Sequence, residues 1–329
     1  MPLTTVSPGL LDSTAQYYSF KNRIINGAMV IDQRNAGASI TFNDGVFPVD
    51  RWTTVATQSS KGTIQQNAGA VTPPAGFINY LGFTSSSAYS VLTGDAFAIQ
   101  QRIEGLNLSD LGWGSANAQT VTLSFWVRSS LTGTFGGVIS NSAQNRSYPF
   151  TYTISSANTW ELETVTIPGD TSGTWLTTNG IGARLNLGLG AGATYSGTAG
   201  AWSGSTLFTA TGATSVVGTN GATFYITGVQ LEKGSTATSF DYRPYGTELA
   251  LCQRYYATGN YPVMRNFTGT TIAVSTSVTL PVTMRATPTV TASVGTVETA
   301  YSNVISSYQT SIGSGASTVT STYTAAIEL

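Results

Sequence analysis

The chain of 329 residues carries 14 lysines and arginines against 15 acidic residues, a net charge of −1, and only 9% of its residues are charged. Binding to a nucleic-acid backbone requires clustered lysines and arginines, so this composition excludes a conventional nucleic-acid surface. The same scarcity of positive charge argues against attraction to an anionic membrane. No stretch approaches the ~18 apolar residues of a membrane-spanning helix, so we expect no membrane insertion.

Two absences limit the chemistry of the chain: it has no histidine and a single cysteine. Without histidine it lacks the commonest general base and the commonest metal ligand. Ser-His-Asp and Cys-His arrangements and histidine-based zinc sites are therefore excluded. One cysteine cannot form an intrachain disulfide, and we expect Cys252 to be a buried small hydrophobic residue. We predict no catalytic residue and no enzyme activity.

The rest of the composition indicates a β protein. Hydrophobic residues make up 41% of the chain and aromatic residues 11%, which argues against disorder. Glycine, serine, threonine, alanine and asparagine fill much of the remainder, as in chains of many short strands joined by polar turns. The N-terminus MPLTTVSPGLLDST has no basic region followed by an apolar run, so we expect no secretory signal.

Residues 1–19 are expected to form an arm, because they contain several loop formers: Pro8, Asp12, Ser13 and Thr14. Its aromatic residues Tyr17 and Tyr18 are candidates for packing on a neighbouring subunit. Two interpretations stay open, namely a frayed terminus and a segment for attachment or trimer contact.

Residues 20–246 predict a β-sandwich. Alternation is clear in 121–128, where Val121, Leu123, Phe125 and Val127 oppose Thr122, Ser124, Trp126 and Arg128, and in 184–189, where leucines oppose Arg184, Asn186 and Gly188. Further strands are expected at 51–57, 62–67, 78–84, 96–104, 134–140, 148–155, 160–167 and 222–231. Turn residues separate them, which is typical of two packed sheets. The segment 190–222 is expected to be a long loop or a pair of irregular strands.

A short linking helix is expected at 247–256, after a turn at 233–235 and an arm that Pro244 keeps extended. Thr247 is the predicted N-cap, and Glu248 lies where the helix dipole favours a negative charge. Residues 257–329 then predict a small C-terminal β-domain. Its alternation around 278–285 includes Pro281, which suggests an edge strand.

Several segments resemble a known family. YITGVQLEKGSTATSFDYRPYG with ELALCQRYY is similar to the end of a carbohydrate-binding-module-like β-sandwich of tailed-bacteriophage structural proteins. NRIINGAMVIDQR and VDRW resemble its opening, and QTVTLSFWVRSS its central strand. MRATPTVT and AAIEL resemble the small β-domain that often follows. The resemblance covers most of the chain from about residue 20.

This resemblance implies an all-β, antiparallel, jelly-roll-like sandwich on the surface of a virion, made in the cytoplasm of a bacterial host. It implies a homotrimer that contacts other phage virion proteins of the tail or capsid and a host cell-surface glycan. The leading hypothesis is a non-enzymatic tail fibre or spike that adheres to this glycan. A capsid decoration or head fibre protein is the alternative. A polysaccharide-degrading appendage is a third, with Glu161 and Glu163 as paired carboxylates on one strand face.

Glycan binding would use aromatic rings for stacking and amides or charges for hydroxyls. Trp126 and Arg128 share one face of their strand, as do Gln100 and Arg102 of another. If the two strands are neighbours, these four residues form a sugar groove. The alternative is that Trp126 packs on another layer and an arginine pairs with Glu104.

A second set of ligand-binding candidates comes from the loops: Trp113, Trp175, Tyr195 and Trp202. Loop aromatics bind ligands in many proteins, and they also plug the ends of sandwiches. The run Gly188–Ala193 matches a dinucleotide fingerprint in its letters, but no helix follows it, so a glycine-rich turn is expected.

No cofactor is expected, and a structural calcium ion stays open. Oxygen ligands are available at Asp32, Asp44, Asp50, Glu232 and Asp241, without the spacing of an EF-hand.

Overall fold

The computed structural model describes residues 21–263, 274–292, 296–309 and 319–329. The expected arm at 1–19 lies outside these residues. The chain divides into two compact units. The first, called the sandwich unit, comprises Met1–Val30 and Gly37–Tyr242, and the second, called the C-terminal unit, comprises Ile31–Ala36 and Arg243–Leu329.

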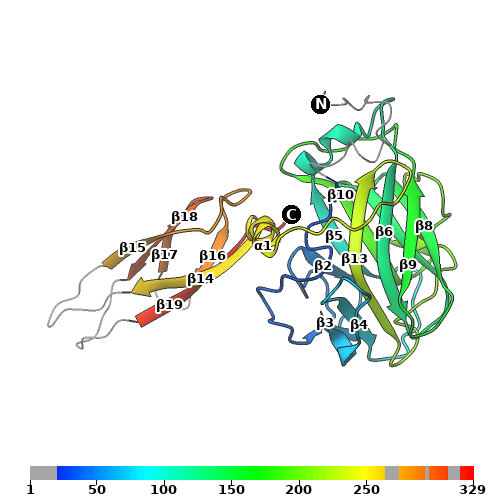
Figure 1. Ribbon diagram of the computed structural model, residues 1–329, viewed down its shortest axis with the longest axis horizontal. Coiled ribbons are helices and arrows are strands. Elements are labelled where there is room, and N and C mark those ends of the chain that lie inside the picture. The colour runs from blue at the N-terminus through cyan, green and yellow to red at the C-terminus, as the bar shows by residue number, and fades with distance from the viewer. Residues whose placement is uncertain (1–20, 264–273, 293–295, 310–318) are drawn as a thin grey trace, which may run out of the picture. The chain divides into compact units, whose positions relative to one another are not determined.

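The sandwich unit contains two antiparallel sheets (Figure 1). Sheet A has the order β1 (Ile40–Thr41), β3 (Gly62–Gln66), β4 (Leu81–Ser85), β13 (Thr223–Lys233), β6 (Val121–Ser129) and β9 (Glu161–Ile167). Sheet B has the order β2 (Trp52–Ala56), β5 (Ala96–Glu104), β10 (Ile181–Ala191), β7 (Gly133–Asn141) and β8 (Ser147–Ile154). The expected jelly-roll-like sandwich is confirmed.

Alternation places the core between the two sheets. In β6, Val121, Leu123, Phe125 and Val127 are fully buried in one hydrophobic cluster, together with Phe97 and Ile99 of β5 and the three leucines of β10. Phe125 of sheet A meets Tyr152 of sheet B edge to face, with ring centroids 5.0 Å apart. Because successive side chains of a strand point to opposite faces, the other residues of these strands lie on the outer faces of the sandwich.

The segment expected to be irregular is the least regular part of the sandwich unit. It contains η6 (Ala193–Tyr195) and two strands of two residues each, β11 (Ser196–Gly197) and β12 (Thr209–Ala210), which pair in parallel. The glycine-rich run at 188–193 ends in η6, with no α-helix after it. Three further 3₁₀ turns are η3 (Ala68–Ala70), η4 (Gly105–Asn107) and η5 (Ser109–Leu111).

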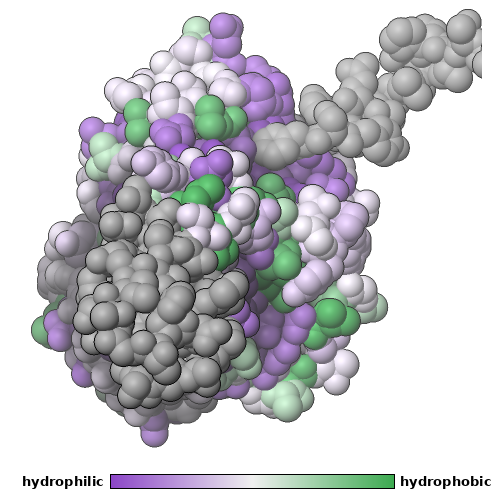
Figure 2. Space-filling view, turned by 90° about the vertical axis from the view of Figure 1, so that its left-hand side faces the viewer, coloured by the Kyte–Doolittle hydropathy of each residue, from purple (hydrophilic) through white to green (hydrophobic). Residues whose placement is uncertain are grey.

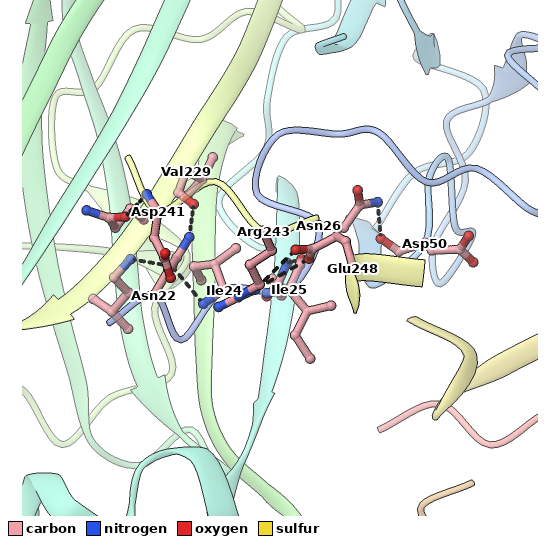
Figure 3. A network of polar contacts seen from close by, with 12 residues as sticks. Asn22, Ile24, Ile25, Asn26, Asp50, Val229, Asp241, Arg243 and Glu248 are labelled. Carbon is pink, nitrogen blue, oxygen red and sulfur yellow. Dashed lines mark hydrogen bonds and ion pairs between the residues drawn. The ribbon is translucent and has the colours of Figure 1, made fainter. Parts of the chain in front are cut away.

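Residues 22–27 bind β13 of sheet A and β5 of sheet B. Asn22 accepts hydrogen bonds from the backbone N–H groups of Ile24 and Leu231 and donates one to the carbonyl of Val229 (Figure 3). The side-chain amide of Gln101 in β5 bonds both the N–H and the carbonyl of Ile25, at 3.0 and 2.9 Å. This segment therefore joins the two sheets at a point where β13 has an irregular register, between Thr227 and Gln230.

The turn and arm after β13 are fixed by buried polar side chains. Glu232 accepts hydrogen bonds from the backbone N–H and the hydroxyl of Thr238, at 2.8 and 2.7 Å. The Gln230 side chain accepts one from the N–H of Asp241 at 2.8 Å. These bonds explain why the motif VQLEKGSTATSFDY forms one local structure.

Among its described residues, the C-terminal unit contains two three-stranded antiparallel sheets and α1. One sheet is β14 (Tyr256–Val263), β19 (Val319–Ala326) and β16 (Thr289–Ala292), and the other is β15 (Val274–Thr279), β18 (Val304–Gln309) and β17 (Thr296–Ala300). Strand β15 ends before Pro281, so the predicted run through 285 is not a continuous strand. Leu280 and Met284 are nevertheless buried in the core of this unit.

The helix α1 spans Tyr245–Gln253, not 247–256, and the prediction of Thr247 as its N-cap is wrong. Pro244 occupies the N-cap position, where its carbonyl accepts hydrogen bonds from the N–H groups of Thr247 and Glu248, and no side chain caps the helix. Glu248 lies in the first turn and forms an ion pair with Arg243 at 3.3 Å. Cys252 is fully buried, as expected.

The segment Ile31–Ala36 belongs to the C-terminal unit because of Arg34. Its guanidinium lies 3.7 Å from the ring centroid of Tyr256 and forms an ion pair with Glu328 at 2.7 Å. Gln33 donates a hydrogen bond to the carbonyl of Tyr256. No helix among the described residues is long and apolar enough to cross a membrane.

Candidate functional site

One end of the outer face of sheet B carries a group of polar side chains, here called the polar cluster: Thr53, Gln100, Arg102, Ser140, Arg184 and Asn186. Strand register brings them together. Gln100 lies between Thr53 and Asn186 on the neighbouring strands, and Arg184 lies between Arg102 and Ser140. Directly opposed side chains have Cβ atoms about 5 Å apart, so the six residues form two adjoining rows.

Gln100 connects the members of the polar cluster. Its Oε1 accepts hydrogen bonds from Arg102 Nε at 2.8 Å and from Arg184 Nη1 at 3.3 Å. Its Nε2 donates to Asn186 Oδ1 at 2.8 Å. One neutral amide oxygen thus serves two guanidinium groups on adjacent strands.

Three polar atoms of the cluster are buried without a hydrogen-bond partner: Asn186 Nδ2, Ser140 Oγ and Thr53 Oγ1. Their residues are at most 1% exposed. Leaving a buried polar group unpaired costs about 1–3 kcal/mol, so most such groups in folded proteins find a partner. The cluster can therefore form hydrogen bonds that the chain itself does not use.

Arg184 is half-buried next to a like charge. Burial, and then the charge of Arg102, lower the pKa of Arg184 from 12.5 to about 10. The guanidinium remains protonated at neutral pH, so the cluster holds a positive charge in a poorly hydrated place.

The remainder of this outer face is covered by the segment after β10. Thr209 of β12 lies against Gly136 and Gly188, where a Cβ atom would come within 2.5 and 2.7 Å of its side chain. Tyr195 and Phe208 pack edge to face at 5.4 Å and cover Ala96 and Ala98. The predicted ligand residue Tyr195 is thus part of this cover, and the polar cluster lies beyond it.

The predicted groove of Gln100, Arg102, Trp126 and Arg128 is not formed. Strand β5 carries the first two in sheet B, and β6 carries the others in sheet A. The condition that these strands be neighbours is therefore wrong. Arg128 donates a hydrogen bond to the carbonyl of Asn158 at 2.9 Å, and its guanidinium lies 5.5 Å from the ring centroid of Tyr225.

Trp126 belongs to an aromatic group on the outer face of sheet A. Phe77, Phe240 and Tyr242 pack on one another with ring centroids 4.9–5.5 Å apart. Gly228 joins them to Trp126, because a Cβ there would lie 2.6 Å from Phe77 and 3.1 Å from Trp126. Tyr242 is 58% exposed, so this group is partly open to solvent.

The three loop tryptophans come together at one end of the sandwich. Trp113 lies 4.6 Å from Trp175 and 5.6 Å from Trp202 by ring centroids, in edge-to-face contacts. All three pack on the hydrophobic core, and each indole N–H donates to an acceptor of the chain. This arrangement matches the alternative that they plug the sandwich.

The paired carboxylates share one face of β9, as their spacing predicts. Glu161 accepts hydrogen bonds from the backbone N–H groups of Ser155 and Ser156, which precede β9 in the chain. Burial, and then the charge of Glu161, raise the pKa of Glu163 above its ordinary value of 4.5.

The acidic residues considered for calcium do not gather. In the described ranges, no three histidine, cysteine, aspartate or glutamate residues lie close enough to hold a metal ion. Asp44 instead accepts a hydrogen bond from the N–H of Ala56, and Glu232 binds Thr238.

Sequence reasoning found only part of the polar cluster. Gln100 and Arg102 were candidates, whereas Thr53, Ser140, Arg184 and Asn186 were missed. Alternation did place Arg184 and Asn186 opposite the leucines of their strand. The missing information was the order of strands, since β5 and β10 are adjacent although about 80 residues separate them in sequence.

The chain has a polar surface with few charges, since only 9% of its residues are charged. On the face shown in Figure 2, hydrophilic and intermediate residues predominate, and hydrophobic residues form small separate areas. Large exposed hydrophobic residues include Ile78 and Leu162.

Comparison with known proteins gives no family. No family model matches the chain, and no curated protein matches it. Among solved structures, it is similar to the enzymatically active domain of tailspike protein 4 of bacteriophage CBA120, with 14% identity and a TM-score of 0.35. That match covers 65% of this chain but only 21% of the tailspike chain.

Carbohydrate-binding modules are also among the similar structures. TmCBM61, solved with β-1,4-galactotriose, has 10% identity and a TM-score of 0.31, over 65% of this chain and 99% of that one. A family 11 module from Clostridium thermocellum, solved with a mixed-linked tetrasaccharide, has 10% identity and a TM-score of 0.28, over 63% and 100%. These ligands are those of the named proteins.

Proposed function

We propose that the chain is a non-enzymatic bacteriophage virion protein whose sandwich unit binds a host cell-surface glycan through the polar cluster. The observation that carries this proposal is the set of three buried polar atoms without partners beside the Gln100 amide. The motifs at 22–34 and 225–256, which resemble those of virion appendage proteins, support the virion setting.

Sugar hydroxyls suit this cluster because each can both donate and accept a hydrogen bond. A hydroxyl near Asn186 would accept from Nδ2, and others would bond Ser140 Oγ and Thr53 Oγ1. The half-buried side chains of Arg102 and Arg184 form the part of the cluster that reaches solvent, and a ligand would enter there.

The proposal is tested by calorimetric titration of the full chain with surface glycans purified from candidate host bacteria. Asn186→Ala removes the unpaired donor and is expected to weaken binding about tenfold, the effect of one lost hydrogen bond to a buried site. Asn117→Ala, at an exposed position, is the matched control. If Asn186→Ala bound the glycan as tightly as Asn117→Ala, the polar cluster would not be the binding site. If the native chain bound no glycan, the proposed glycan-binding function would be refuted.

We further propose a homotrimer located on the tail as a fibre or spike. Light scattering should then give three times the mass of 34.3 kDa. Antibody labelling of intact particles decides between the tail and the capsid, where a head fibre would carry the same sandwich. A stable monomer would contradict the assembly.

The absence of catalysis is part of the proposal. Glu161 is engaged by two backbone N–H groups, and no histidine is available as a base. Incubation with the bound glycan should release no new reducing ends, and a steady release would contradict the proposal.

A further inference from the structure

We propose that the polar cluster binds an acidic saccharide, and that Arg184, with Asn186 and Ser140 beside it, receives the carboxylate. This inference rests on the proposed glycan-binding function and names the class of glycan.

Two like charges face each other in the polar cluster. Arg102 and Arg184 lie directly opposite each other on β5 and β10. Like charges in this position destabilise a sheet, so the pair costs free energy in the protein alone. A third arginine adds to the charge, since Arg51 donates to the backbone carbonyl of Arg102 at 2.7 Å.

Arg184 donates its hydrogen bonds to uncharged oxygens of the protein. Within the described part of the chain it bonds two neutral oxygens, Gln100 Oε1 at 3.3 Å and the carbonyl of Ser142 at 3.4 Å. Both distances are long for a bond from a guanidinium group, which normally lies about 2.8 Å from a carboxylate oxygen. Glu104 lies two residues from Arg102 on the same face of β5 and offsets part of the charge. A carboxylate from a ligand would give Arg184 the short, charged acceptor that it lacks.

Hydrogen-bond donors without a partner lie next to Arg184 in the strand register. Ser140 lies opposite Arg184 on β7, and its buried hydroxyl has no partner. Asn186 follows Arg184 by two residues on the same face, and its Nδ2 is an unused donor. Burial, and then the charge of Arg102, lower the pKa of Arg184 to about 10, which means that the protein destabilises the charged guanidinium. A bound anion would stabilise this charged form. A carboxylate supplies several acceptor sites for such donors, whereas a neutral sugar supplies only hydroxyls.

The test uses two pairs of probes, in each of which a methyl ester replaces the carboxylate: tetragalacturonate and its methyl ester, and 3′-sialyllactose and its methyl ester. Affinities for the native full chain are measured by calorimetry. We expect at least one acid to bind about tenfold or more tightly than its ester, because a charged hydrogen bond is lost on esterification. Arg184→Gln should remove this preference. Arg128→Gln, the same substitution on the outer face of sheet A, should leave it intact.

A second measurement needs no ligand. Arg184→Met replaces the guanidinium by an unbranched apolar side chain and removes the like charge, so the melting temperature of the free protein should stay the same or rise. A fall of several degrees would mean that the guanidinium serves the fold, and would overturn the inference. Arg184→Lys should keep the fold and part of the preference for the acid, since lysine cannot bind a carboxylate through two parallel hydrogen bonds.

The outcomes separate the two proposals. Equal binding of an acid and its ester would overturn the acidic saccharide and leave glycan binding in place. Sodium sulfate or acetate could also displace the acidic saccharide at the same concentration. The cluster would then be a site for small anions in general, and the inference would be overturned. If the native chain bound neither pair of probes and none of the purified host glycans, both proposals would be overturned.

Discussion

Asn22 Oδ1 accepts a hydrogen bond of 3.1 Å from the backbone N–H of Leu231, across 209 residues of sequence. The same side chain donates to the carbonyl of Val229, also at 3.1 Å. A single asparagine therefore satisfies two backbone groups of β13 next to its register irregularity, beyond the residues 223–226 that pair with β4. This side chain holds the opening motif against the motif at β13.

Asn22→Ala should destabilise the sandwich unit. The substitution leaves the N–H of Leu231 and the carbonyl of Val229 buried and unpaired, at a cost of about 3 kcal/mol in the free energy of unfolding. For a unit of this size, the melting temperature should fall by roughly 6–12 °C. Differential scanning calorimetry measures this fall, with the exposed Asn117→Ala as control. A change of less than about 2 °C would show that water replaces the lost bonds.

Gly27→Ala should be at least as damaging, for a steric reason. A Cβ at this position would lie 2.2 Å from the carbonyl oxygen of Val229, and the backbone would have to move. This would break the 2.9 Å hydrogen bond from the N–H of Val229 to the carbonyl of Gly27. We expect a loss of about 3 kcal/mol, measured by urea denaturation.

The control for Gly27 is Gly94→Ala, because no atom lies within 4 Å of the Cβ added there. It should be neutral or slightly stabilising, by up to about 1 kcal/mol, since alanine restricts the unfolded chain. Similar destabilisation by both substitutions would mean that the close approach at Gly27 is not its cause.

Sequence periodicity was enough to predict the strands and which residues face the core. Val121, Leu123, Phe125 and Val127 are buried as their alternation indicated, and β5 has the predicted bounds. The reason is local: a side-chain period of two fixes the face of each residue once one face is apolar.

The assignment of strands to sheets was beyond local reasoning. It depends on long-range pairing, which is why Arg102 meets Arg184 and not Arg128. The predicted helix start was wrong for a different, local reason: Pro244 occupies the N-cap position of α1, and no side chain caps the helix. The unpaired donor of Asn186 was also invisible in the sequence, because the burial that isolates it comes from several strands and their cover.

Glu163 should make the stability of the sandwich unit depend on pH. Burial, and then Glu161, raise its folded-state pKa above the ordinary 4.5. The contribution of Glu163 to the free energy of unfolding is therefore fully present below about pH 4.5 and is lost as the pH rises through the pKa of the folded state. Glu163→Gln, which stays neutral, should be more stable than the native chain at pH 7.5 and equal to it at pH 3.5. Chemical denaturation at the two pH values measures both stabilities. If the native chain and the variant differed by the same free energy at pH 7.5 and pH 3.5, the ionisation of Glu163 would not be the cause.

Trp175→Ala should affect stability and leave glycan affinity unchanged. Trp175 packs between Trp113 and Trp202 with centroid distances of 4.6 and 5.5 Å, so its loss opens a gap in the plug of the sandwich. Since the side chain is half-buried, we expect a loss of about 2 kcal/mol, less than for a fully buried tryptophan. Leu162→Ala, at a 56% exposed position, is the control and should change little. A loss of glycan affinity at unchanged stability would make Trp175 a ligand residue.

Cys252 should report the opening of the C-terminal unit. It is the only cysteine of the sequence and is fully buried on α1, so a thiol reagent such as Ellman's reagent reaches it only after local unfolding. In native buffer we expect labelling at least about 100-fold slower than in guanidinium chloride, which corresponds to an opening free energy of about 3 kcal/mol. One thiol per chain should react after unfolding, and Cys252→Ser should give no signal. Rapid stoichiometric labelling of the native chain would show that α1 does not protect the thiol, because a buried sulfur cannot attack the reagent.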